Sequence, residues 1–193
     1  MNDSSISSLL GAAAAQAVPV VRAVREEQLG DPTPCADYDV RELVDHLYDV
    51  MLNFARLARK EPSSFQKDPD HLKGLADWRE RFTEETDRVV AAWGEPGAEE
   101  GTTGGMRQPA RVVGTIMLLD MTVHAWDLAR ATGQEFTPDP AGVEVLSGVI
   151  DELAPAAREA GIFEEPKQAP AGASRFETLL ATTGRDPGWQ PPA

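Results

Sequence analysis

The segment 112–131 most constrains what this chain can fold into, because an apolar helix there must accommodate a carboxylate and an imidazole. At about 100° per residue, Asp120 and His124 lie one turn apart on the same helix face. Apolar residues surround them on that face: Val113, Ile116, Met117, Val123, Leu128 and Ala131. A buried unpaired charge is costly, so both side chains need partners. Either a divalent cation or a hydrogen bond between the two residues would satisfy them.

The rest of the chain is also dominated by helical periodicity. Apolar residues recur at spacings of three and four, which predicts helices over 7–29, 40–60, 74–93, 112–131, 140–160 and 175–183. Asp39 and Glu42 have the spacing of a capping box at the start of the second helix. No long alternating pattern indicates strands. We therefore predict an all-α four-helix bundle with additional C-terminal helices, forming one domain over 1–193 with a flexible tail at about 185–193.

Charge and cysteine content narrow the function classes. The chain has 32 acidic and 18 basic residues, a formal net charge of -14 that disfavours nucleic acid and anionic membrane surfaces as partners. No basic residue precedes Arg22, and no stretch approaches the ~18 uninterrupted apolar residues of a membrane span. The single cysteine cannot form an internal disulfide. We expect a cytoplasmic protein that binds a small-molecule substrate.

A bundle would bring a second helix to the Asp120 and His124 pair. His46 lies at the edge of the apolar stripe of the 40–60 helix, so it can point toward that pair. Two imidazoles and one carboxylate suit Zn²⁺ and leave coordination positions open, as in catalytic sites. Asp49 and Asp127, each one turn after a histidine, are candidates to orient the rings. His71 falls in a linker, where we expect it to be exposed to solvent.

Two alternatives stand beside a metal-dependent enzyme. In the first, the chain is a non-catalytic helical binding or structural protein, and its His and Asp residues satisfy one another in the core. In the second, Cys35 is a nucleophile paired with a histidine. Cys35 lies between prolines and a turn, where a free buried thiol with a structural role is the commoner case. A serine hydrolase is not supported, because no G-x-S-x-G motif occurs.

Three segments resemble a known family. PTPCADYDVRELVDHL and LLDMTVHAWDLARATGQ are similar to the two signatures of an actinobacterial family related to the mycothiol-dependent maleylpyruvate isomerase N-terminal domain, within the DinB-like superfamily. SRFETLLATTGRDP resembles the closing segment of that family. The similarity covers almost the whole chain, and the first two motifs are specific in their order and spacing.

The resemblance implies a DinB-like bundle with a divalent metal held by His46, Asp120 and His124. Zinc is the expected metal, with nickel or iron as alternatives. The isomerase-type pattern has Glu where this chain has Asp120, so the ligand geometry differs. The superfamily includes enzymes that use a low-molecular-weight thiol, which implies a thiol transferase or isomerase with mycothiol as co-substrate. The resemblance also implies a homodimer.

Overall fold

The computed structural model describes residues 4–67, 69–104 and 107–192, and it confirms the predicted all-α class. Six α-helices follow one another in the described chain: α1 (Ile6–Ala23), α2 (Val40–Ala58), α3 (Trp78–Trp93), α4 (Ala110–Thr132), α5 (Pro140–Glu159) and α6 (Arg175–Thr182). A short 3-10 helix, Glu26–Gln28, follows α1. Extended pairing in the described residues is limited to isolated bridges such as Pro32 with Asp39.

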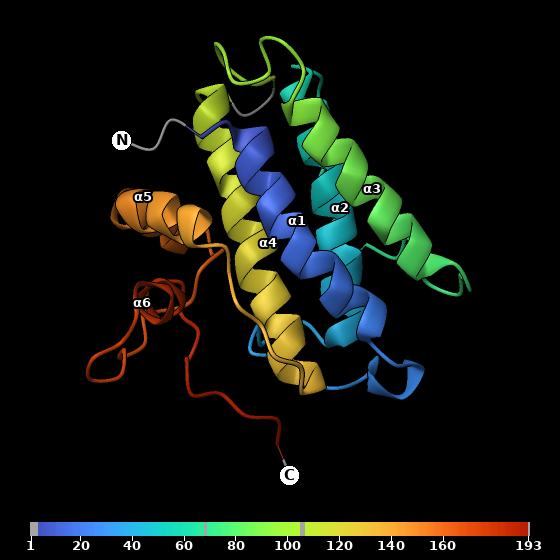
Figure 1. Ribbon diagram of the computed structural model, residues 1–193, viewed down its shortest axis with the longest axis vertical. Helices are drawn as coiled ribbons and strands as arrows, with labels where there is room; N and C mark the ends of the chain where they lie inside the picture. The colour runs from blue at the N-terminus through green and yellow to red at the C-terminus, as the bar shows by residue number, and fades with distance from the viewer. Residues whose placement is uncertain (1–3, 68, 105–106, 193) are drawn as a thin grey trace.

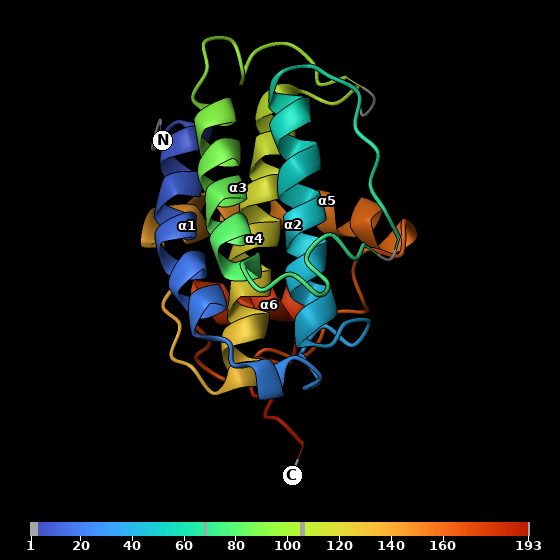
Figure 2. The same ribbon diagram turned by 90° about the vertical axis from the view of Figure 1, so that its right-hand side faces the viewer.

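Helices α1 to α4 form a four-helix bundle. In the bundle α1 and α4 run in the same direction and α2 and α3 in the opposite one, so the connection from α2 to α3 returns along the length of the bundle (Figures 1 and 2). Helix α1 packs against α3 and α4, and α2 packs against the same two helices. Large side chains such as Phe82, Trp93 and Met117 are fully buried between them.

Helix α4 is the central element of the fold. It is buried on almost all sides, because α1 and α2 cover it within the bundle and α5 covers it from outside. By length and composition alone, α1 and α4 could cross a membrane, but 83% of the apolar window of α4 is buried inside the protein. Gly133 ends α4 in the left-handed conformation, at φ 71°.

Helices α5 and α6 are the predicted additional C-terminal helices. They lie across one side of the bundle next to α4 rather than along it (Figures 1 and 2). Asp139 caps α5 and Ser174 caps α6 through their side chains. The segment predicted to be a flexible tail is in contact with the bundle at two points, since Arg185 is buried and Trp189 packs against the core.

Candidate metal centre

The structure brings His46 from α2 together with Asp120 and His124 from α4. One ligand atom from each residue lies within 4.8 Å of the others, so the three residues could hold a metal ion. Nε2 of His46 is 3.7 Å from Oδ2 of Asp120, and Nε2 of His124 is 3.4 Å from Oδ1 of the same carboxylate. The Oδ2 atom of Asp120 is buried without a hydrogen-bond partner.

The Nδ1 atoms of His124 and His46, on the far side of each ring from Asp120, each lie near another side chain. Nδ1 of His124 lies 2.9 Å from Oδ2 of Asp127, and a carboxylate can only accept, so this nitrogen donates. The predicted orienting role of Asp127 therefore has the expected contact. Nδ1 of His46 lies 3.4 Å from the Tyr38 hydroxyl, and the Tyr38 ring stacks on the imidazole.

The facing charges shift the pKa values of Asp120 and His124 in opposite directions. Burial alone raises the pKa of Asp120, but the neighbouring imidazoles of His124 and His46 outweigh it and hold the pKa well below its usual range. Burial alone lowers the pKa of His124, but the carboxylates of Asp120 and Asp127 outweigh it and raise the pKa. Without a metal ion, this pair is therefore stabilised as an ion pair.

Two expectations for nearby polar residues were wrong. His71 is half-buried rather than exposed to solvent, and its Nε2 lies 2.9 Å from Oδ1 of Asp49. Asp49 consequently does not orient His46 but holds the α2–α3 connection, because its other oxygen accepts from the backbone of Gln66 and from the side chain of Asn53. The acidic residue one turn after His46 thus has a structural contact with the linker.

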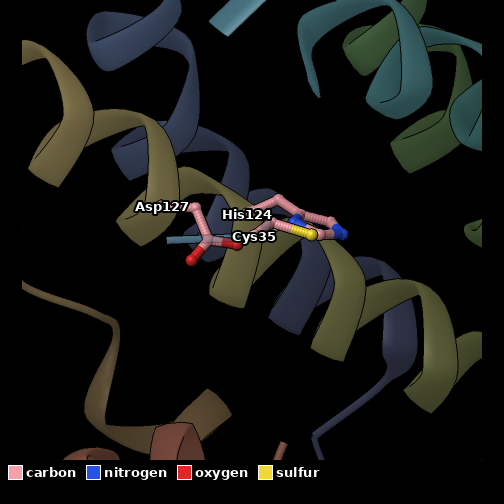
Figure 3. A group of neighbouring side chains, drawn as sticks. All are labelled: Cys35, His124 and Asp127. Carbon is pink, nitrogen blue, oxygen red and sulfur yellow. Dashed lines mark hydrogen bonds and ion pairs between the residues drawn. The ribbon is translucent and has the colours of Figure 1, made fainter. Parts of the chain in front are cut away.

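Cys35 lies next to the predicted ligands, although it is distant from His124 and Asp127 in sequence. Figure 3 shows its sulfur beside the ring of His124, and ligand atoms of Cys35, His124 and Asp127 also lie within 4.8 Å of one another. Burial raises the pKa of the Cys35 thiol to about 12, against the opposing charge of Arg185. The thiol is therefore protonated near neutral pH, which is unfavourable for the nucleophile hypothesis.

Arg185 is a residue of this site that the sequence analysis missed. It follows α6, it is buried, and its Nη2 lies 3.2 Å from Oδ2 of Asp127, the oxygen that also accepts from His124. Its Nη1 donates to the Thr183 carbonyl. The only available signal was the TTGRDP sequence in the closing motif, and nothing in that sequence indicates its partner.

A cavity of about 530 Å³ opens beside the three predicted ligands. His46, Asp120 and His124 line it, together with Tyr38, Cys35 and Arg185. Side chains of α4, α5 and the segment 161–163 form the rest of its wall. His46 and Asp120 each keep about a quarter of their side-chain surface exposed, at 23% and 24%, so a small molecule in the cavity could reach both.

Comparison with known proteins identifies the family. The model of the mycothiol maleylpyruvate isomerase N-terminal domain matches residues 10–129, which include His46, Asp120, His124 and Asp127 but not Arg185. Two uncharacterized proteins of Mycobacterium tuberculosis, from strains CDC 1551 / Oshkosh and ATCC 25618 / H37Rv, are each 30% identical over 164 residues. These alignments cover 84% of this chain and 87% of each relative. No solved structure matches the chain. From the extent of the family match, the chain belongs to the mycothiol maleylpyruvate isomerase N-terminal domain family.

Proposed function

We propose that the chain binds one divalent metal ion, Zn²⁺ first among the candidates, through His46, Asp120 and His124. We further propose that it is a metal-dependent enzyme of the mycothiol-dependent transferase or isomerase type. The observation that carries the proposal is the spacing of the three side chains around the partnerless oxygen of Asp120.

The distances in the cluster fit a shared ion better than direct hydrogen bonds. Two ligands on a tetrahedral zinc, each bonded at about 2.1 Å, lie about 3.4 Å apart. The two nitrogen–oxygen distances to Asp120 are 3.4 and 3.7 Å. Hydrogen bonds between nitrogen and oxygen are shorter, at about 2.7–3.2 Å. This difference favours a metal centre over a set of core polar groups that satisfy one another.

The donor set and its exposure support a catalytic rather than a structural metal. Structural zinc sites are closed by four protein ligands, whereas catalytic sites use three and keep a position open. The three residues here face a cavity, and two of them are partly exposed to it. A thiol or a water molecule can therefore reach the open position.

The surrounding residues prepare His46 and His124 as ligands. Because Nδ1 of His124 donates to Asp127, Nε2 of the neutral ring carries the lone pair and faces the cluster. Stacking on Tyr38 holds the His46 ring in place. When bound, a divalent ion supplies a Lewis acid that lowers the pKa of a coordinated thiol. The family description supports mycothiol as that thiol, with other low-molecular-weight thiols as alternatives.

Metal content tests this proposal directly. Protein purified without an immobilised-metal column is analysed by mass spectrometry as wild type, His46→Ala, His124→Ala and His71→Ala. We expect near one equivalent of metal in the wild type and in His71→Ala, which removes a histidine outside the cluster, and loss of metal in the other two. A transfer assay then follows the loss of mycothiol thiol groups with an added electrophile.

The opposite result supports the non-catalytic alternative. If wild-type protein is empty and added zinc neither binds nor raises the melting temperature, the three residues are polar groups of the core and the chain is a binding or structural protein. If metal binds equally in all four proteins, the assignment of His46 and His124 is wrong.

A further inference from the structure

The cavity beside the proposed metal centre has two apolar walls that the metal chemistry does not require. Helix α4 contributes one wall, and its residues fall at helical spacings of three and four on either side of Asp120: Val112, Ile116, Leu119 and Val123. Helix α5 and the chain after it contribute the other, with Leu153, Ala157, Ile162 and Phe163 among its residues. The proposed ligands line the same cavity.

The apolar walls are accessible from solvent. Val112 is 36% exposed and Ile162 is 70% exposed, which makes them two of the three large hydrophobic side chains classed as exposed in the described residues. Protein cores contain few voids larger than a water molecule, whereas binding cavities range over about 300–1,000 Å³. A cavity of about 530 Å³ with an exposed apolar rim therefore has the dimensions of a ligand site.

The charges around the cavity disfavour an anionic ligand. Among the described residues of its wall, the cationic side chain of Arg185 is already paired with Asp127, and both histidines lie beside Asp120. The remaining charged groups in its wall are carboxylates, namely Asp37, Asp120 and Glu152. The chain as a whole has a formal net charge of -14. In the metal-free protein, a ligand that brings its own negative charge would lie among carboxylates without a free cation to receive it.

We infer that this cavity binds a compact, uncharged, apolar compound, held between Ile116 of α4 and Leu153 of α5. Its assignment as a substrate rests on the proposed function, in which the compound is the electrophile that the thiol attacks. In a transfer, the thiolate sulfur forms a bond to carbon, the leaving group departs with the electrons of its own bond, and the thiol proton passes to solvent. Binding itself does not depend on the metal.

The experiment uses the neutral dye Nile red as probe and metal-free protein. We expect saturable fluorescence enhancement with one site per chain. Ile116→Asn and Leu153→Asn should each weaken binding about tenfold, because the ligand would cover these half-buried apolar side chains and a polar amide there would lose that apolar contact. The matched control is Phe65→Asn, which changes an exposed apolar residue outside the cavity wall and should leave binding unchanged. Melting temperatures establish that all variants are folded.

Competition between two compounds of equal length tests the charge preference. We expect 1-octanol to displace the dye at a concentration at least tenfold lower than octanoate. Equal or better displacement by octanoate would overturn the preference for an uncharged ligand. Absence of saturable binding, or equal effects of the cavity variants and Phe65→Asn, would overturn the cavity assignment.

These outcomes are independent of the metal test. If the dye binds as expected but zinc does not bind, the proposed function fails and the apolar ligand site stands. If zinc binds to His46 and His124 but the dye pattern is absent, the metal centre stands and this inference fails.

Discussion

Nη2 of Arg185 lies 3.2 Å from Oδ2 of Asp127, and this contact joins two buried residues that are 58 positions apart. The same carboxylate oxygen accepts from Nδ1 of His124 at 2.9 Å. The segment after α6 is therefore connected through Asp127 to the proposed ligand His124. Arg185 lies outside residues 10–129, which match the family model, whereas Asp127 and the three proposed metal ligands lie inside them.

Arg185→Gln should affect both stability and the metal site. Removing one partner of a buried ion pair costs about 3–5 kcal/mol, because the other charge stays buried without compensation. Residues that orient metal ligands typically change metal affinity by about 10–100-fold. We therefore expect a loss of unfolding free energy of about 3 kcal/mol in urea and zinc binding at least tenfold weaker, measured by chelator competition at a temperature where both proteins are folded.

Arg158→Gln is the matched control for this prediction. Arg158 also links C-terminal elements, since its Nη1 donates to the Thr182 carbonyl, but Asp127 is not its partner. This variant should lose at most about 1 kcal/mol and keep wild-type zinc affinity. If both arginine variants weaken zinc binding equally, Arg185 acts through general stability. The double variant Asp127→Asn/Arg185→Gln should recover part of the lost stability.

Asp120 should be required as a charged ligand rather than as a hydrogen-bond acceptor. Asp120→Asn keeps one carbonyl oxygen but removes the negative charge, so we expect zinc affinity to fall at least about tenfold. Asp120→Glu should retain zinc, because Asp120 faces the open cavity and a longer side chain has room there. Asp49→Asn, a buried carboxylate of α2 outside the cluster, serves as control. Unchanged affinity in Asp120→Asn would exclude this carboxylate from the metal centre.

The thiol of Cys35 should be unreactive at neutral pH. With a pKa of about 12, roughly one molecule in ten thousand carries the thiolate at pH 8, against about one in ten for an ordinary cysteine. We expect alkylation by iodoacetamide to be slower in the folded protein than in urea by about a thousandfold, and to accelerate about tenfold per pH unit between pH 8 and 11. The thiolate fraction of any cysteine rises with pH up to its pKa, so the raised pKa of Cys35 extends this rise well above neutral pH.

Cys35→Ser provides the matching test of function. It should keep the metal content of the wild type, because the proposed ligands are His46, Asp120 and His124. Rapid alkylation at pH 7 together with loss of transfer activity in Cys35→Ser would instead revive the hypothesis that Cys35 is the nucleophile.

Local patterns predicted most of the helices, and tertiary contacts account for the differences. The predicted start of the second helix is confirmed, because Asp39 and Glu42 form the expected capping box. The third helix was predicted from Gly74 but begins at Trp78, since Gly74 has φ 76° and the backbone N–H of Leu72 donates to Asp45. The first was predicted to reach Leu29 but ends at Ala23, where Val24 is extended and its carbonyl accepts from Arg79.

The residues of the candidate site also fall into two groups: those that spacing along one helix predicts, and those that depend on long-range contacts. Asp120, His124 and Asp127 fall on one helix, so their spacing alone predicted that they are neighbours. His46 required only the assumption of a bundle. Arg185 and Cys35 could not be predicted in this way, because their positions depend on how α5, α6 and the loop before α2 fold back onto α4. Periodicity within one helix carries no information about such long-range contacts.

Gly114 should be a strict requirement for packing of α4 against α1 and α3. A Cβ atom added there would lie 2.7 Å from Cγ2 of Ile6 and 3.0 Å from Cζ3 of Trp93, both of which belong to fully buried side chains. Because a close-packed core cannot yield without strain, Gly114→Ala should lower the free energy of unfolding by about 1–3 kcal/mol. The control is Gly148→Ala in α5, where a Cβ atom meets nothing within 4 Å. That change should instead stabilise the protein by about 0.5–1 kcal/mol, through the higher helix propensity of alanine. Urea unfolding of the two variants checks both signs, and a neutral or stabilising Gly114→Ala would mean that α1 can move away from α4 at this crossing.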